Sequence, residues 1–307
     1  MTATDELTTP LLVDDQGAAM ITGCAAGRQL FKYSYRPALD PFECPAPFFH
    51  PLRTLGGGVV TNYRPNDHRW HKGLAMTISH LSGQNFWGGG TYVHGAEAHG
   101  YVNVPNVGSL VHREFESFDS TSFSEHVDWI AHESEHWIAE KRRVAVLDVD
   151  AGDGRWTLEF ATELLNVSGR VLEIGSPTVF GRVLAGYSGF FWRGPRAFAG
   201  GRVLAGGGLE GPGVMGQRAP WLAFSGEFDG IDGHATLVFR AAPDTAGGDP
   251  YWFVRSEPFA AVNPSLAFYK GLDLPPDETL ARTYRITIAD GVWDRERIET
   301  HLTEQSW

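Results

Sequence analysis

The sequence has few cysteines and no long hydrophobic run. Its two cysteines among 307 residues, Cys24 and Cys44, are too few for a disulfide framework and fit a reducing compartment. No run of about 18 apolar residues is present, so we expect no transmembrane helix and no membrane partner. The N-terminal stretch MTATDELTTPLLVDDQG is acidic and lacks an apolar segment, so we also expect no signal peptide and a cytoplasmic location.

Basic residues are scarce as well. Lysine and arginine number 25 against 37 acidic residues, which gives a formal net charge of −12. Binding to nucleic acid or to an anionic lipid surface needs clustered basic side chains, so neither partner is expected. The charge fits an enzyme that handles a small substrate, and the sequence leaves open whether the chain forms a homo-oligomer.

Helical periodicity is rare, whereas signals of strands and turns are frequent. The chain contains 37 glycines and 18 prolines, and polar and apolar residues alternate in many short runs. The segment 131–143 could be taken for a helix, but its apolar positions do not keep the helical period, so we interpret it as a strand. Alternation is clearest in five segments: 126–132, 143–150, 155–167, 235–240 and 283–291.

This pattern predicts an all-β protein, a large antiparallel β-sandwich that forms a single domain over residues 1–307. Residues 1–15 are expected to be poorly ordered. The segment 293–307 is expected to form a short C-terminal helix, because Ile298 and Leu302 lie on one face among charged residues. The pair Asp153-Gly154, between two strand-like runs, predicts a hairpin turn.

Histidines gather in one window, residues 48–80. Imidazole transfers protons near neutral pH, so we predict that His50, His68 and His71 are catalytic. The glycine triplet Gly56–Gly58 is expected to form a turn that makes the two halves of the window antiparallel, with His50 facing the loop of His68 and His71. The alternative is an ordinary pair of strands whose histidines cap backbone groups.

Motifs for cofactors and for a nucleophile are absent. Two glycine-rich loops, residues 198–216 and 242–250, carry no nucleotide-binding pattern, and no GxSxG or CxxC sequence is present. We therefore expect no cofactor, no serine nucleophile and no closed zinc site. A divalent metal is the alternative, and its ligands would be His50, His68 and His71.

Arginines, amides, carboxylates and aromatic rings beside glycine-rich turns are candidates for binding a sugar. Guanidinium and amide groups hydrogen-bond hydroxyls, and flat rings stack on the apolar face of a sugar. The alternative is that most of these rings form the core of the sandwich. The candidates are Arg53, Arg64, Asp67, Asn85, Trp87, Tyr92, Tyr187, Trp192, Arg193 and Glu257.

Several long stretches resemble the bacterial family DUF6807, whose members are often labelled methane oxygenase PmoA-like. The stretches are FFHPLRTLGGGVVTNYRPNDHRWHKGL, NFWGGGTYV, GYSGFFWRGPR, MGQRAPWLAFSG and the closing PFAAVNPSLAFYKGLDLPPDETLARTYRITIADG. The oxygenase label comes from a protein with several membrane spans, and this chain has none, so that activity is not implied. The resemblance implies carbohydrate catabolism instead, because such genes often lie near sugar dehydrogenases.

The C-terminal stretch LPPDETLARTYRI is similar to the closing strands of galactose-mutarotase-like proteins. There a Pro-Gly-Glu turn precedes the last strand, and here Pro276-Asp277-Glu278 takes its place. The resemblance implies a galactose-mutarotase-like supersandwich. Catalytic roles are not carried over, because the spacing in HRWHKGL does not match the histidine-glycine loop of aldose epimerases.

The function expected from these observations is a carbohydrate-active enzyme that acts on a sugar, keto-sugar or glycoside by histidine-based general acid and base chemistry. It would be a sugar epimerase or isomerase, or a lyase that cleaves glycosides. Two alternatives remain. One is a metal-dependent lyase or hydrolase of modified sugars, and the other is a non-catalytic carbohydrate-binding partner of a sugar dehydrogenase.

Overall fold

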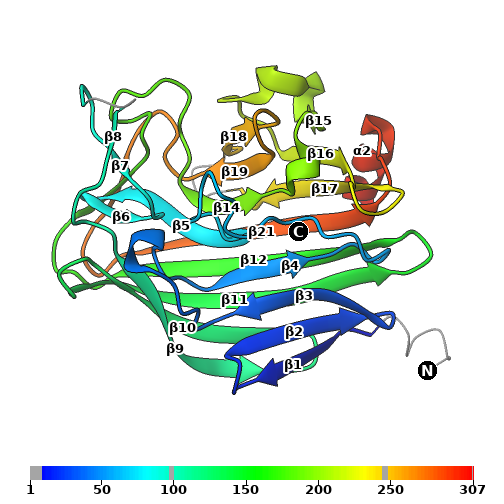
Figure 1. The fold of residues 1–307 in the computed structure, drawn as a ribbon, viewed down its shortest axis with the longest axis horizontal. Helices are drawn as coiled ribbons and strands as arrows, with labels where there is room; N and C mark the ends of the chain where they lie inside the picture. Colours follow the sequence, from blue (N-terminus) through cyan, green and yellow to red (C-terminus); the bar gives the residue numbers. More distant parts are fainter. Residues whose placement is uncertain (1–8, 97–99, 244–247, 306) are drawn as a thin grey trace.

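The computed structural model describes residues 9–96, 100–243, 248–305 and 307. Within these ranges the chain folds into two large antiparallel sheets that pack face to face, with a short ribbon and a C-terminal helix outside them (Figure 1). The predicted all-β antiparallel sandwich with a C-terminal helix is therefore confirmed. None of the helices in the described part is long and apolar enough to cross a bilayer.

The larger sheet has 11 strands among the described residues. They are β1 (Leu11–Asp15), β2 (Met20–Ala25), β3 (Arg28–Ser34), β4 (Phe48–Leu52), β5 (Leu74–Leu81), β6 (Gln84–Phe86), β13 (Leu172–Gly175), β14 (Gly189–Arg193), β18 (Tyr251–Arg255), β19 (Ala261–Ser265) and β20 (Leu272–Leu274). Their order is β1-β2-β3-β4-β5-β14-β19-β18, with β6 and β13 beside β5 and β20 beside β13. Strands from both halves of the chain thus meet at β5 and β14.

The second sheet has eight strands within the same described ranges. They are β9 (Ser109–Phe118), β10 (Ser122–Ile130), β11 (His136–Asp150), β12 (Arg155–Asn166), β15 (Arg202–Ala205), β16 (Trp221–Glu227), β17 (His234–Ala241) and β21 (Thr279–Asp290). Their order is β15-β16-β17-β21-β12-β11-β10-β9. The five segments with clear alternation each overlap one of these strands, and the predicted hairpin joins β11 to β12, with Gly154 at φ 65°.

The remaining elements are short. They are the ribbon of β7 (Thr91–Tyr92) and β8 (Tyr101–Val102), the 3₁₀ turns η1 (Pro41–Glu43), η3 (Arg196–Phe198), η4 (Gly206–Gly208) and η5 (Gly211–Val214), and the helix α2 (Arg295–Glu304). The Asp294 side chain caps α2 by accepting from the Arg297 amide. Ile298 and Trp293 bury their side chains against Trp221 on the outer face of the eight-stranded sheet, beside which α2 lies in Figure 1.

The expectation that residues 1–15 are poorly ordered is wrong for residues 11–15. These residues form β1, which pairs with β2 from Leu11 opposite Cys24 to Asp15 opposite Met20. The reason is that Leu12 reaches the core, where it is 4% exposed, while its neighbours face outward. Residues 1–8 lie outside the described residues.

A network of charged side chains is buried between the two sheets. Arg142 on β11 is fully buried and donates to both carboxylate oxygens of Glu140, each at 2.8 Å. Its Nη1 also donates to the Tyr33 hydroxyl at 2.7 Å and lies 3.6 Å from Glu125. Because Tyr33 belongs to β3 and Glu125 to β10, this network links the two sheets across an otherwise apolar core.

Candidate functional site

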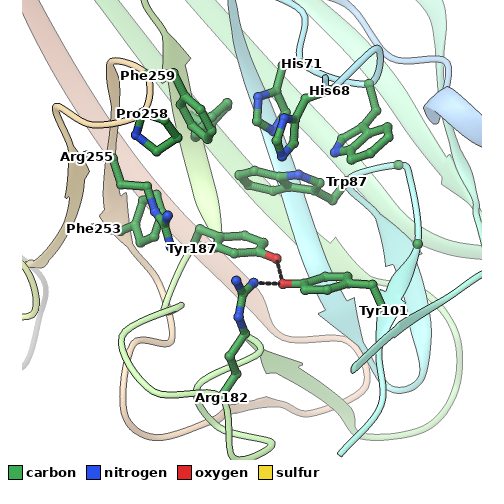
Figure 2. A pocket seen from close by; sticks show the side chains of 14 residues that line it. His68, His71, Trp87, Tyr101, Arg182, Tyr187, Phe253, Arg255, Pro258 and Phe259 are labelled. Carbon is green, nitrogen blue, oxygen red and sulfur yellow. Dashed lines mark hydrogen bonds between the residues drawn. The ribbon is translucent and has the colours of Figure 1, made fainter. Parts of the chain in front are cut away.

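The candidate site is a pocket of about 390 Å³ on the outer face of the 11-stranded sheet (Figure 2). This volume lies within the range of small-molecule sites, roughly 300–1,000 Å³. Among the residues that the structure describes, no carboxylate lines it. Its lining side chains include the rings of Trp70, Trp87, Tyr101, Tyr187, Phe191, Phe253 and Phe259 and the polar groups of His68, His71, Arg182 and Arg255.

Alternation along β14 decides which side chains reach the site. Phe190 and Trp192 point into the sandwich core. Phe191 and Arg193 therefore point to the opposite face, where Phe191 lines the pocket and Arg193 lies behind His71. One short strand thus supplies both the core and the site.

Strand β18 follows the same rule. Trp252 and Val254 are part of the core. Phe253 and Arg255, one residue later in each case, point outward and line the pocket. In the strand order β5-β14-β19-β18, this strand lies at the sheet edge, and its outward side chains line the same pocket as the two histidines.

The loop that carries His68 and His71 consists of two consecutive turns. The His68 amide donates to the Pro65 carbonyl at 3.0 Å, and the His71 amide donates to the His68 carbonyl at 2.9 Å. As a result the two imidazole rings stack, with centroids 4.6 Å apart and planes 24° from parallel. The buried Lys72 ammonium fastens the loop by donating to three carbonyls, those of Glu43, Cys44 and Trp70.

Asp67 fixes the tautomer of His68. Oδ2 of Asp67 lies 2.9 Å from Nδ1 of His68. The hydrogen bond from His68 and the charge of Arg193 outweigh partial burial, so the pKa of Asp67 is lowered and its carboxylate accepts. Nδ1 of His68 consequently carries the proton, and Nε2 keeps a free lone pair. Burial lowers the pKa of His68 although Asp67 acts in the opposite direction, so the ring is neutral at neutral pH.

Arg193 fixes the opposite tautomer of His71. Its Nη1 lies 3.0 Å from Nδ1 of His71, and a guanidinium can only donate. Nδ1 of His71 therefore accepts, and the proton of the ring is on Nε2. Burial, followed by the proximity of the second imidazole and of the Arg193 guanidinium, holds the pKa of His71 well below its usual range. The described residues offer no hydrogen-bond partner to Nε2 of either histidine.

Arg193 also ties the two histidines into one unit. Its Nη2 donates to Oδ2 of Asp67 at 3.4 Å, so Asp67 is shared by His68 and Arg193. The guanidinium lies 3.7 Å from the ring centroid of Phe259, at cation–π distance. Its side chain is only 3% exposed, so Arg193 positions the histidines from behind.

The wall around Trp87 depends on Asn85 and on glycines. Oδ1 of Asn85 accepts from the amides of Trp87 and Gly88, both at 2.9 Å. A Cβ on Gly88 would lie 2.7 Å from Cβ of Trp70, and one on Gly89 would lie 2.5 Å from the indole ring of Trp70. The glycines after Trp87 therefore let this loop approach Trp70 closely.

The opposite end of the pocket holds two tyrosines and two arginines. The hydroxyls of Tyr101 and Tyr187 lie 2.5 Å apart, and Arg182 donates to the Tyr101 hydroxyl (Figure 2). The guanidinium of Arg255 lies 5.5 Å from the ring centroid of Phe253. Burial raises the pKa of Tyr187 well above its usual range, so its hydroxyl stays protonated.

Three residues predicted for the site lie outside the pocket. The turn at Gly56–Gly58 does make the chain antiparallel, but His50 turns toward Thr61, whose Oγ1 is 2.9 Å from Nδ1, and stacks on another ring. Arg53 donates to the Gly57 carbonyl within the turn. Arg64 forms a bidentate ion pair with a carboxylate, that of Glu43 on η1, at 2.6 and 2.7 Å. These side chains hold the window together and do not line the cavity.

Four other candidates are also placed away from the pocket. Trp192 is fully buried in the core and donates to the Val60 carbonyl, because its position on β14 faces inward. Tyr92 packs on Tyr101 outside the cavity, and Asn85 supports the Trp87 loop. Glu257 is exposed, whereas Pro258 and Phe259 after it line the pocket.

The structure brings together Asp67, His68, His71, Trp87, Tyr187 and Arg193 of the predicted residues. It adds lining residues that the sequence prediction missed: Trp70, Tyr101, Arg182, Phe191, Arg255 and Phe259. Trp70 and Phe191 lie within the motifs HRWHKGL and GYSGFFWRG, so the motifs that predicted the site also contained these two residues. Arg182 and Arg255 carry no local signal, because only the strand order brings them to the cavity.

The predicted metal ligands do not meet. Within the described ranges, no three or more His, Cys, Asp or Glu side chains are grouped to hold a metal ion, and His50 lies away from His68 and His71. The stretch HESEH at residues 132–136 has the spacing of the zinc motif HExxH, which brings two histidines to one face only on a helix. Here it spans a turn and the start of β11.

Comparison with known proteins identifies a family and distant structural likenesses. The profile of DUF6807, described as a family of unknown function, matches residues 23–303. No curated protein matches the chain. An α-galactosidase from Lactobacillus brevis is 10% identical in sequence, with a TM-score of 0.45. The alignment covers 97% of this chain and 42% of the α-galactosidase. The GH36 α-galactosidase AgaB from Geobacillus stearothermophilus is 10% identical in sequence, with a TM-score of 0.43. The alignment covers 91% of this chain and 41% of AgaB. The chain thus spans about two-fifths of these proteins, and a likeness this distant says nothing about what it binds.

Proposed function

This chain belongs to DUF6807, a family of unknown function, and we propose that it is an enzyme that moves a proton on a sugar or keto-sugar. His68 acts as the general base, and His71 acts as a neutral hydrogen-bond donor. The observation that carries the proposal is the pair of stacked imidazoles at the wall of one pocket, one with its Nδ1 beside a carboxylate and the other with its Nδ1 beside a guanidinium.

The two histidines have complementary roles because their partners differ. Nε2 of His68 has a free lone pair, and Asp67 stabilises the imidazolium that forms when this nitrogen takes a proton. Nε2 of His71 carries a hydrogen, and Arg193 keeps the ring from accepting a second proton. A base and a donor side by side suit a substrate in which a C–H bond lies next to a carbonyl group.

The reaction on a keto-sugar would run as follows. His68 removes the proton from the carbon next to the carbonyl, and the electron pair of that C–H bond moves onto the carbonyl oxygen. The Nε2 hydrogen of His71 stabilises the resulting enolate by hydrogen bonding. Protonation of the enolate carbon by solvent water on its opposite face, with release of the first proton from His68 to solvent, gives an epimer. In an elimination, the enolate instead re-forms the carbonyl and its carbon–carbon electron pair forms a double bond to the β carbon. The substituent on that carbon leaves with its bonding electrons and takes the proton from His68, as in a lyase.

The walls of the pocket support a sugar as substrate. Trp70, Trp87 and Phe259 offer flat apolar faces beside the histidines, with Trp87 5.9 Å from His71 between ring centroids. The tyrosine hydroxyls and guanidinium groups at the other end offer donors to sugar oxygens. Such a mixture of ring faces and directed polar groups suits a molecule that is apolar on one face and hydroxylated around its rim.

Solvent hydrogen exchange tests the proposal. Candidate aldoses and keto-sugars are incubated with the protein in D₂O, and deuterium uptake at the carbon next to the carbonyl is followed by NMR. His68→Gln should lower the exchange rate by about 10²–10⁴-fold. The control is His234→Gln, which changes an exposed histidine at the start of β17.

Two results would contradict the proposal. One is an unchanged exchange rate in His68→Gln on a substrate that wild type turns over. The other is a sugar that binds in the pocket without exchange or conversion by wild type, which would favour the non-catalytic carbohydrate-binding alternative.

A further inference from the structure

We propose that the pocket binds an acidic sugar, whose carboxylate or phosphate group is held by Arg182 and Arg255 at the end opposite the histidines. The inference rests on the proposed function, because it names the substrate class of the same pocket.

The two arginines lack the counter-ions that other arginines near the site have. Arg64 is paired with Glu43, and Arg193 with Asp67. Across the described ranges, by contrast, no carboxylate forms an ion pair with Arg182 or Arg255. These two guanidinium groups therefore bring unbalanced positive charge to the pocket of a protein whose net charge is −12.

Without a bound ligand, two partly buried guanidinium groups that lack carboxylate partners cost free energy. Both side chains are only partly exposed, and each stands over an aromatic ring, with Arg182 4.8 Å from the Tyr101 centroid. Burial and the charge of Arg182 lower the pKa of Arg255, which means that the two like charges are close enough to repel each other. An anion that enters between them would relieve this repulsion and restore the charge balance.

The hydrogen-bond pattern leaves donors free for an anion. Arg182 donates to the Tyr101 hydroxyl, which in turn shares one hydrogen with the Tyr187 hydroxyl. Whichever tyrosine donates in that bond, one hydroxyl hydrogen remains for a ligand. Together with the forked N–H groups of two guanidiniums, it gives the donor set that binds a carboxylate or phosphate oxygen.

The positions of the rings explain why the charged group should belong to a sugar that also reaches the histidines. Trp87 lies between the two ends, 5.9 Å from His71 and 4.5 Å from Tyr187 between centroids. An anion held at Arg182 and Arg255 would leave the rest of the ligand over Trp87, with its far carbons at His68 and His71 (Figure 2). The arginines would thus orient the substrate without taking part in proton transfer.

Binding measured with matched sugars tests the inference. Galactose, galacturonate and galactose 6-phosphate, and the corresponding three forms of glucose, are titrated by calorimetry at low salt. At least one acidic form should bind about 10–100-fold more tightly than its neutral parent, which is the contribution of a charged hydrogen-bonded contact. The carboxylate and phosphate arms decide which anion the site prefers.

Variants assign the preference to the proposed residues. Arg255→Gln should remove most of the advantage of the acid over the neutral sugar, whereas Arg202→Gln, a change at an exposed arginine on β15, should leave it unchanged. Circular dichroism confirms that each variant is folded. Equal affinity for acidic and neutral sugars, no binding of any acid below about 10 mM, or an undiminished preference in Arg255→Gln overturns the inference.

A third variant separates this inference from the proposed function. His68→Gln should abolish hydrogen exchange while keeping the preference for the acid. A wild-type protein that binds the acid but catalyses no exchange would refute the enzyme and leave the anion subsite standing. Hydrogen exchange that proceeds equally well on neutral and acidic sugars would refute the anion subsite and leave the proposed enzyme activity standing.

Discussion

Replacing Arg193 by Met tests the basis of the site without requiring a known substrate. The change removes the donor that obliges Nδ1 of His71 to accept. It also removes one of the charges that lower the pKa of His71, so that pKa should rise toward its ordinary value. Nδ1 and Nε2 of His71 should then share the proton between two tautomers, while His68 stays protonated on Nδ1 by its bond to Asp67.

The cost in stability can be worked from the contacts. The charged hydrogen bond at 3.0 Å contributes about 1.5–3 kcal/mol, and the cation–π contact with Phe259 at 3.7 Å contributes up to about 2 kcal/mol. Removal of Arg193 also removes a buried Nε that has no hydrogen-bond partner, which returns about 1–3 kcal/mol. The midpoints of these ranges leave a net loss of about 1 kcal/mol, or roughly 2–4 °C in Tm.

Two measurements check this prediction. Nitrogen-15 NMR of the imidazole rings reports the tautomer of each histidine, and thermal unfolding reports the stability. Arg196→Met is the control, since Arg196 is exposed and lies three residues further along the chain. A wild-type spectrum with the proton on Nδ1 of His71, or a spectrum that does not change in Arg193→Met, would refute the assignment of opposite tautomers.

Three further predictions follow from buried charge. Because burial lowers the pKa of His68, kcat/KM should stay level down to about pH 6.5 and fall only below it, and a decline that begins at higher pH in the pH–rate profile would contradict this. Arg142→Met should cost about 3–5 kcal/mol in denaturant unfolding, because it strands buried carboxylates, whereas Arg143→Met, which breaks a half-exposed pair, should cost less than about 1 kcal/mol; equal costs would contradict the network. Burial and Arg53 lower the pKa of His50 to about 4, so the unfolded chain takes up a proton first as pH falls from about 6.5, and stability is lost in that window. His50→Gln should therefore lose less stability than wild type between pH 7 and pH 5, by about 1–2 kcal/mol, and a parallel loss would show that His50 does not contribute.

The strands could be predicted from the sequence because their alternation is local. Each of the five clearest segments overlaps a strand of the eight-stranded sheet, one face of which packs on the core. The loop of His68 and His71 was also predictable, since the proline before it and Gly73 after it, at φ 67°, mark turns that bring residues three apart together.

The assignments that failed depend on information that the sequence does not carry. In GFFWRG, four consecutive residues could face either way, and only the packing of Phe190 on Phe160 across the sandwich shows that Trp192 is core and Arg193 is not. The sequence predicted Arg64 as a ligand-binding residue, but in the folded chain its guanidinium is paired with the carboxylate of Glu43, 21 positions away. Arg255 reaches the pocket only because β18 and β14 flank β19. Which alternate side chains of a strand face the core, and which strands are neighbours in a sheet, are set only in the folded chain.

The shared strands have an evolutionary consequence. On β14 and β18, even-numbered positions fill the interior and odd-numbered positions carry Phe191, Arg193, Phe253 and Arg255. Point substitutions at odd positions can therefore change ligand preference while the packing of the interior persists, so divergence of specificity is separable from loss of the fold. An insertion or deletion of one residue has no such freedom, because it exchanges the two sets at once and places guanidinium groups in the interior. Selection on these strands should tolerate replacement and reject any change in length.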